Sequence, residues 1–350
     1  MIIKSFEFDQ YVWRLNTTFL GNLNLIVGKN AVGKSKTLNA IANVAKFIKG
    51  EISGLVPVHR CRIEFVDESA HELVYSYHGD LAEIHEESMI LDGKMIIYRT
   101  SNHAQIKDEV VNPPSNKLVI QSQRDTAKYP EFEKVMIWAE QTRGFSFSEL
   151  SSSKPYEVPS MFAQNLDITD IYEKLDDEKC EFVKAKMREL GYDINAIEKT
   201  EIQQFKFITL KEEGLVLPLF SNSISNGMLR TFYILTYLAY ISSVVGAKTL
   251  LIDDLGEGLD FSRSSRLSKM MFDYCEQKGI QLIVTSNDNF LMNAIDLSHW
   301  IILRRDKSVV SSLSNQTHPD MFFKFKKMGL NNFDMLSTDY IDRFLSEAKS

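Results

Sequence analysis

Several kinds of residue are scarce in this chain of 350 amino acids, and each scarcity argues against a class of protein. There are only three cysteines, Cys61, Cys180 and Cys275, and their separation fits neither a metal site nor a redox pair. Reduced, mostly buried thiols in a cytoplasmic protein are the expected state. The N-terminus lacks the basic start and the apolar run of a signal peptide, which also favours the cytoplasm.

Long apolar runs are also missing. The longest uncharged stretch, residues 231–247, spans 17 positions and includes threonine, serine and three tyrosines. It is short and polar for a membrane span, so a buried core helix is the better interpretation and no membrane partner is expected. The net charge of −7 argues against binding of nucleic acid by bulk charge, although it does not exclude a local basic patch.

One stretch that is present, LIVGKNAVGKSKTLNAIANV at residues 25–44, has the spacing of a phosphate-binding loop. Apolar residues before it indicate a buried strand, and helical spacing after it predicts a helix over 35–50. Glycines let main-chain N–H groups surround a phosphate. We expect Lys34 to reach the β- and γ-phosphates of ATP, and the Ser35 hydroxyl to bind Mg²⁺. The predicted nucleotide-binding residues of this loop are Gly28, Lys29, Asn30, Ala31, Val32, Gly33, Lys34, Ser35 and Lys36.

An acidic strand predicts the second half of an ATPase site. The sequence TLLIDD at 249–254 is an apolar strand ending in two carboxylates, which is the form of a Walker B motif. Asp253 is expected to hold Mg²⁺ through water, and Asp254 to polarise the attacking water. The 219 residues from Lys34 to Asp253 require a large insertion, which disfavours small GTPases, simple kinases and compact RecA-like motors.

The remaining pattern alternates strands with helices, which predicts an α/β fold around a parallel sheet with covered faces. A β-rich stretch with a hairpin turn at Asp92-Gly93 follows the first helix. Strands are predicted over 1–8, 22–27, 117–121, 248–254, 280–286 and 299–305, helices over 129–142, 168–191, 226–243, 262–278 and 289–296, and a hairpin over 205–220 turning at Glu213-Gly214.

The segment before the acidic strand narrows the class of ATPase. Residues 224–230 read Ile-Ser-Asn-Gly-Met-Leu-Arg at a predicted helix start, and GEGLD at 256–260 follows the acidic strand. This order of motifs resembles the soluble ABC-type ATPases of the SMC, RecF and OLD group, especially the shorter AAA family ATPases of bacterial defence systems. Their signature reads Leu-Ser-x-Gly-x-x-Arg, and their phosphate loop reads Gly-x-Asn-x-x-Gly-Lys-Ser, with Asn30 here as the asparagine.

The resemblance covers nearly the whole chain and implies a single ABC-type head, 1–350, with a mixed β-sheet lobe and a helical insertion. It divides into a Walker A half (1–60), an inserted lobe (60–220), a signature, Walker B and switch half (221–310) and a C-terminal helical extension (311–350).

In this family two heads enclose two ATP molecules, which implies a homodimer or larger oligomer. By that resemblance Ser225, Asn226 and Gly227 would contact the nucleotide bound to the other head, and Asp260 would lie at the seam. A Q-loop glutamine is implied at either Gln121 or Gln123.

Two positions depart from the family pattern. The catalytic carboxylate is usually glutamate, and here it is Asp254, which is one methylene shorter. The switch position is usually histidine, and here it is Asn287, which hydrogen-bonds but carries no charge. We therefore predict slow ATP hydrolysis, with ATP acting more as a clamp than as fuel.

Two absences shape the functional hypotheses. No long heptad region is present, which excludes DNA-length coiled-coil arms. The sixty or so residues after Asn287 are too few for the Toprim nuclease domain of OLD proteins. The favoured hypothesis is an ATP-gated switch for a separate nuclease or toxin in bacterial defence. The alternatives are a RecF-like DNA-repair ATPase, with candidate contacts at 304–307 and 321–328, and the ATPase subunit of a transporter.

Overall fold

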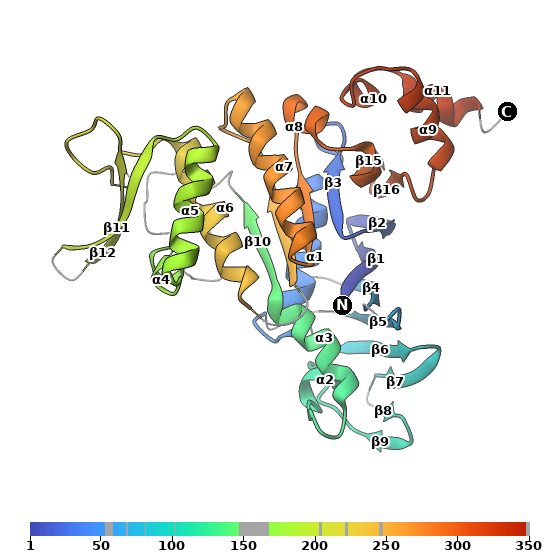
Figure 1. The fold of residues 1–350 in the computed structure, drawn as a ribbon. Helices are drawn as coiled ribbons and strands as arrows, with labels where there is room; N and C mark the ends of the chain where they lie inside the picture. The colour runs from blue at the N-terminus through green and yellow to red at the C-terminus, as the bar shows by residue number, and fades with distance from the viewer. Residues whose placement is uncertain are drawn as a thin grey trace.

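The structure is a computed structural model, and it describes residues 1–52, 59–67, 69–80, 82–101, 103–146, 168–202, 205–220, 223–244 and 248–347. Within these residues, fourteen strands form one continuous sheet, and a separate hairpin pairs β11 (Ile194–Ile202) with β12 (Phe205–Glu212). Figure 1 shows this hairpin and its neighbouring helices at one side of the molecule, and the antiparallel strands at the other.

One end of the large sheet is parallel. Its strands run in the order β10, β13, β14, β3 and β15, and each pairs in parallel with the next. Their bounds are β3 (Leu23–Val27), β10 (Thr142–Ser146), β13 (Lys248–Asp253), β14 (Ile280–Thr285) and β15 (Trp300–Asp306). Because the strands are parallel, the segments after β3, β13 and β14 all leave from the same edge of the sheet, where α/β proteins place their sites.

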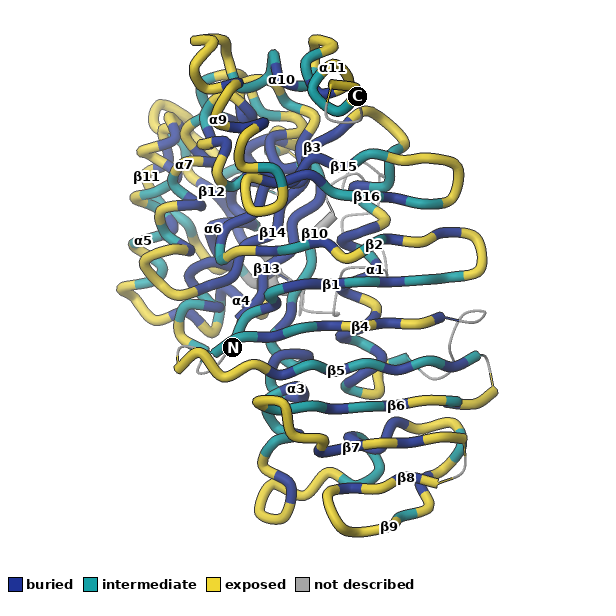
Figure 2. Tube along the Cα trace, turned by 90° about the vertical axis from the view of Figure 1, so that its right-hand side faces the viewer, coloured by how far each residue is buried: buried dark blue, intermediate teal, exposed yellow. Residues whose placement is uncertain are grey.

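The sheet continues past β15 as a mostly antiparallel lobe in the order β16, β2, β1, β4, β5, β6, β7, β8 and β9. Figure 2 shows these strands as successive rungs, with buried and more exposed residues alternating along several of them. Their bounds are β1 (Ile2–Gln10), β2 (Trp13–Phe19), β4 (His59–Val66), β5 (Glu72–Gly79), β6 (Ile84–Leu91), β7 (Lys94–Thr100), β8 (His103–Ile106), β9 (Glu109–Val111) and β16 (Val309–Ser314).

Helices cover both faces of the parallel strands, and two apolar cores result. The alternation along β3 shows the division, because Leu25 and Val27 join one core and Ile26 joins the other. The first core contains α4 (Ile168–Glu173), α5 (Asp177–Glu189), α6 (Asn226–Ser242), α7 (Phe261–Gln277), α8 (Asn289–Ala294) and the terminal helices α9 (Pro319–Lys327), α10 (Asp334–Ser337) and α11 (Tyr340–Glu347). The second contains α1 (Lys34–Ile48), α2 (Val119–Ser122), α3 (Pro130–Gln141) and the antiparallel lobe.

The α/β prediction is confirmed, and so is the buried helix expected within 231–247. That helix is α6, in which apolar side chains such as Leu235 and Leu238 are fully buried. No helix in the described ranges is long and apolar enough to cross a membrane.

The predicted strand over 117–121 is wrong, because the structure has the short helix α2 there. A brief β-branched run does not by itself distinguish a buried strand from a buried helical turn. The carboxylate of Glu87 on β6 decides the outcome, since it accepts hydrogen bonds from the N–H groups of Val119 (2.6 Å) and Ile120 (3.3 Å). These bonds satisfy N–H groups of the first helical turn, which have no partner within the helix.

The single helix predicted over 168–191 is also wrong, because the chain forms α4 and α5 with a break between them. Asp176 ends the break by capping α5, where its carboxylate accepts a hydrogen bond from the N–H of Lys179 at 2.9 Å. The apolar spacing predicted one continuous helix through the break. The sequence signal for two helices is the acidic cap at Asp176, which the prediction did not use.

The hairpin predicted over 205–220 is only partly right. The chain does turn at Gly214, whose φ is +83°, but the returning limb makes only an isolated bridge between Leu210 and Leu219. The main partner of β12 is β11, a strand that was not predicted. The extension over 311–350 is likewise not wholly helical, since β16 occupies its first residues.

Candidate functional site

The glycine-rich loop joins β3 to α1, the strand–loop–helix context that the sequence predicts. Three loop residues have positive φ, namely Gly28 (+151°), Ala31 (+64°) and Gly33 (+110°). A Cβ atom on Gly28 would lie 2.7 Å from the carbonyl oxygen of Leu303 in β15, which is too close for any side chain. The loop backbone therefore lies directly against the neighbouring strand, and its tip at residues 29–31 is exposed.

Lys34 begins α1 and curls back over the loop. Its ammonium group donates hydrogen bonds to the carbonyl oxygens of Gly28 (2.9 Å) and Lys29 (3.4 Å). Burial lowers the pKa of Lys34, and the carboxylates of Asp254 and Asp253 act in the opposite direction. The lysine and both Walker B carboxylates therefore share one site, although 219 residues separate Lys34 from Asp253 in the sequence.

Side chains from outside the motif complete the surroundings of the loop. The indole of Trp13 on β2 lies beside Gly33, with its Nε1 atom 3.3 Å from where a Cβ would stand. The ammonium group of Lys36 lies 5.0 Å above the same ring, and Arg305 donates to the carbonyl oxygen of Ala31 at 3.2 Å. Sequence reasoning missed Trp13, because it comes from a distant strand and belongs to no local motif. It considered Arg305 only as part of the candidate DNA contact at 304–307, and not as a neighbour of this loop.

The two acidic residues occupy the carboxyl end of β13 as predicted. Asp253 is buried, and its Oδ1 atom accepts a hydrogen bond from the hydroxyl of Thr285 at 2.6 Å. The same hydroxyl accepts a hydrogen bond from the backbone N–H of Asp254 at 2.8 Å. Asp254 has a φ of +52°, a conformation that non-glycine residues adopt infrequently.

Asn287, the residue at the predicted switch position, contacts the carboxylate of Asp254. Its Nδ2 atom donates to Oδ1 of Asp254 at 3.1 Å. Burial raises the pKa of Asp254, and the neighbouring carboxylates of Asp253 and Glu257 raise it further. A raised pKa makes this carboxylate a stronger base than an exposed aspartate.

The signature segment begins α6. Ser225 caps the helix, and its exposed hydroxyl accepts a hydrogen bond from the N–H of Met228 at 3.3 Å. Asn226 is also exposed, whereas Gly227 is buried against the segment that follows β13. A Cβ on Gly227 would lie 2.6 Å from the carbonyl oxygen of Gly258, so glycine is required for this close approach.

The segment 256–260 lies between α6 and α7. Arg230 of α6 is buried and pairs with Glu257, with 3.3 Å between its Nη1 atom and the carboxylate. Asp260 caps α7 by accepting hydrogen bonds from the N–H groups of Ser262 and Arg263, both at 3.0 Å. The signature helix and this segment are therefore in direct contact.

The structure does not support either glutamine as a Q-loop residue. The side chain of Gln121 donates to the carbonyl oxygens of Phe47 and Ile48 at the C-terminal end of α1. A helix of 15 residues separates that end from the phosphate loop, a length of about 22 Å. Gln123 ends the same short helix α2, so both predictions are wrong. The edge strand beside β13 is β10, which pairs Ser146 with Asp253 and leads into residues outside the described ranges.

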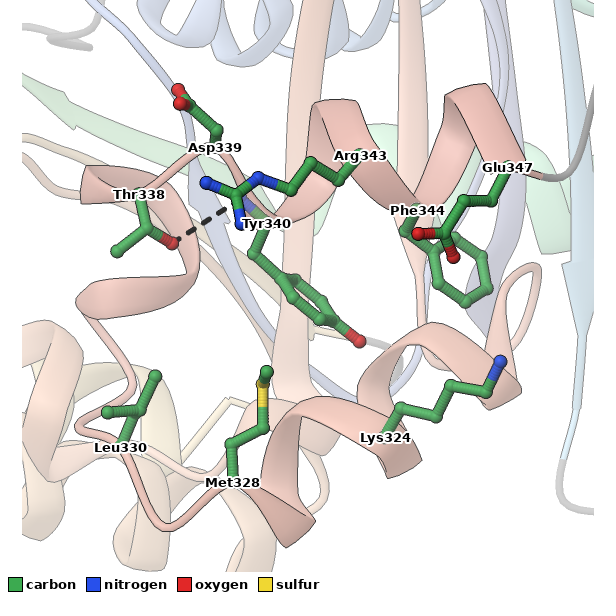
Figure 3. Close-up of a pocket in the computed structure, with 9 residues that line it drawn as sticks. All are labelled: Lys324, Met328, Leu330, Thr338, Asp339, Tyr340, Arg343, Phe344 and Glu347. Carbon is green, nitrogen blue, oxygen red and sulfur yellow. Dashed lines mark hydrogen bonds between the residues drawn. The ribbon is translucent and has the colours of Figure 1, made fainter.

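The basic and aromatic stretch at 321–328 forms most of α9, but its charges are balanced. Lys326 pairs with Asp296 at 2.9 Å, and the ammonium groups of Lys324 and Lys327 lie over phenylalanine rings. Residues 319–347 hold four basic side chains and five acidic ones. A cavity of about 500 Å³ lies between α9 and α11. Figure 3 shows that acidic Asp339 and Glu347 line it together with Lys324 and Arg343.

The residues at the sheet edge fit ATP and Mg²⁺ chemically. The loop supplies main-chain N–H groups at a helix N-terminus, the arrangement that binds phosphate. Ser35 and Asp253 provide the hydroxyl and carboxylate oxygens that Mg²⁺ prefers. No cluster of three or more histidine, cysteine, aspartate or glutamate side chains able to hold a metal occurs in the described residues.

A family model described as "AAA domain, putative AbiEii toxin, Type IV TA system" matches residues 63–293, more than half of the chain. The chain belongs to this family. The matched range contains the signature segment, both Walker B carboxylates and Asn287, and it begins after the phosphate loop.

The fold is that of an SMC head. A crystal structure of the Smc head bound to the C-winged helix domain of ScpA is similar with a TM-score of 0.57, at 14% sequence identity, over 89% of this chain and 97% of that chain. No curated protein matches the chain. Family and fold together support a nucleotide-binding ATPase of the ABC type.

Proposed function

We propose that the chain binds and slowly hydrolyses Mg·ATP, and that two copies associate around the nucleotide to control a separate effector protein. The observation that supports this most is the meeting of Lys34, Asp253, Asp254 and Asn287 at one edge of the parallel sheet. These side chains come from the loop after β3 and from the segments after β13 and β14.

Each side chain has a role that its surroundings suit. Lys34 neutralises charge on the β- and γ-phosphates, while Ser35 and Asp253 would hold Mg²⁺. When bound, Mg²⁺ supplies further neutralisation of the phosphate oxygens. Asp254 accepts a proton from the attacking water, and Asn287 fixes one of its oxygens. The short carboxylate of Asp254 and the uncharged side chain of Asn287 favour slow ATP hydrolysis.

The surface near this site favours a second copy of the chain as the partner. The aromatic rings of Phe261 and Phe290 lie 4.6 Å apart, and the two side chains are 61% and 42% exposed. Phe261 directly follows Asp260, and Phe290 lies three residues after Asn287. Aromatic side chains contribute strongly to interfaces, so a partner that covers this pair would gain from burying it. Association would also bring the exposed N-terminus of α6, with Ser225, toward the nucleotide of the other copy.

The proposal of a separate effector rests on the family description, which names a toxin and a toxin–antitoxin system. Direct DNA binding, the RecF-like alternative, gains no support from α9, because its surroundings carry no excess of positive charge. The alternative role as the ATPase subunit of a transporter also gains no support.

The first experiment is light scattering of the chain with and without ATP and Mg²⁺, together with measurement of phosphate release. Lys34→Ala is the test variant, and Lys94→Ala is the matched control, since Lys94 is an exposed lysine on the distant strand β7. We expect an ATP-dependent increase in mass that Lys34→Ala abolishes and Lys94→Ala retains. A monomer in all conditions, or equal behaviour of the two variants, would contradict the proposal. An oligomer already present without ATP would contradict the ATP-dependent part.

A further inference from the structure

Thr285, which is not among the predicted site residues, makes three hydrogen bonds to the segment 253–255. The register of β13 and β14, which pairs Ile252 with Val284, places Thr285 beside Asp253. On its other side, Thr285 pairs with Ile26 of β3, two residues before Gly28. Thr285 therefore lies between the acidic strand and the strand that leads into the phosphate loop.

The direction of its hydrogen bonds is fixed by chemistry. The backbone N–H of Asp254 can only donate, so the hydroxyl oxygen of Thr285 accepts this bond at 2.8 Å. The hydroxyl hydrogen is then directed to Oδ1 of Asp253, 2.6 Å away. Its backbone carbonyl also accepts from the N–H of Leu255 at 2.9 Å. One residue thus binds three consecutive residues of the turn.

These bonds orient both carboxylates. The bond to Asp253 engages Oδ1 of its carboxylate, while the bond to the Asp254 backbone stabilises its left-handed conformation. The side chain of Thr285 is fully buried, and a β-branched side chain has few rotamers, so its hydroxyl is held firmly.

We propose that Thr285 is a positioning residue that sets the Asp253 carboxylate for Mg²⁺ and holds Asp254 toward the phosphate site. This inference rests on the proposed ATPase function. It adds a residue that touches neither nucleotide nor metal, and it predicts a selective effect on the Mg²⁺-dependent part of nucleotide binding.

The test is titration of Mg²⁺ into the chain with a fluorescent ATP analogue, for Thr285→Val and Thr285→Ser. Valine keeps the shape and removes the hydroxyl, whereas serine keeps the hydroxyl. We expect Thr285→Val to raise the Mg²⁺ concentration needed for half-maximal binding about tenfold, the effect of one hydrogen bond to a charged group. Thr285→Ser should stay within about threefold of the wild type, and binding without Mg²⁺ should be unchanged.

Thr249→Val is the matched control. Thr249 is equally buried on β13, at the end of that strand opposite to Asp253. Its hydroxyl lies 3.3 Å from the side-chain oxygen of Gln281 on β14. An unchanged Mg²⁺ requirement in Thr285→Val, an equal change in Thr249→Val, or no recovery in Thr285→Ser would each overturn the inference. If Thr285→Val does not fold, Thr285→Ala against Thr285→Ser isolates the same hydroxyl.

A double variant separates this inference from the proposed function. In an Asp253→Asn background, Thr285→Val should cause little further loss of Mg²⁺ dependence, because the two residues act through one bond. Additive losses would overturn the inference and leave the ATPase proposal intact. A wild-type chain that binds no nucleotide, with or without Mg²⁺, would instead overturn both.

Discussion

The contact between Gly227 and Gly258 gives the sharpest prediction, because its geometry sets the size of the effect. In Gly227→Ala the new Cβ would lie 2.6 Å from the carbonyl oxygen of Gly258 and 3.2 Å from Cδ2 of Leu259. Ordinary contact begins near 3.4 Å, so the start of α6 and the 256–260 segment must separate by roughly 0.8 Å.

Two opposing terms determine the stability of Gly227→Ala. Overpacking costs about 1–3 kcal/mol, whereas replacing glycine by alanine in a helix contributes up to about 1 kcal/mol. The net loss should therefore be no more than about 3 kcal/mol, and the variant should remain folded. ATP-dependent association and phosphate release should be affected more than stability, because a displacement near 1 Å in a catalytic arrangement lowers the rate by up to about a hundredfold.

The assay compares melting temperature, ATP-dependent mass and phosphate release for the wild type and Gly227→Ala. Gly21→Ala is the control, because the nearest atoms to its added Cβ lie 3.9 Å away and its φ is not in the left-handed region. We expect at least a tenfold loss of ATP-dependent association in Gly227→Ala and none in Gly21→Ala. Wild-type association and turnover in Gly227→Ala would refute the argument that this close approach sets the signature helix.

Further predictions concern Asp254, Glu87 and Phe261. Asp254→Asn should lower phosphate release at least a hundredfold while retaining ATP binding, and equal losses in both assays would contradict its role as a base. Because burial raises the pKa of Asp254, turnover should already fall on acidification above the ordinary aspartate range, which a pH–rate profile checks. Burial also raises the pKa of Glu87 from 4.5 to about 7, so the folded chain retains a proton that the unfolded chain releases. Its free energy of unfolding should fall as pH rises from about 4.5 to 7, by up to about 1.4 kcal/mol per unit, and urea titrations should show Glu87→Gln removing this slope. Phe261→Ser should weaken ATP-dependent association without changing ATP affinity, and an unchanged dimer would exclude the aromatic pair with Phe290 from the seam.

The sequence by itself was enough for the local features of the site. The loop at 28–35, the acidic strand end at Asp253 and Asp254, and the capped helix at Ser225 are specified by adjacent residues whose spacing matches their backbone conformation. Long elements with clear periodicity, such as α6, were predicted close to their observed bounds for the same reason.

Only the tertiary structure decided features that depend on groups distant in the chain. Glu87 turns a predicted strand into α2, and it lies more than thirty residues before that helix. Gln121 has a suitable residue type for a Q-loop, but packing places it at the wrong end of α1. Trp13 and Thr285 join the site through strand order alone. Side-chain hydrogen bonds and strand neighbours depend on the tertiary structure, so they cannot be predicted from the local spacing of residues.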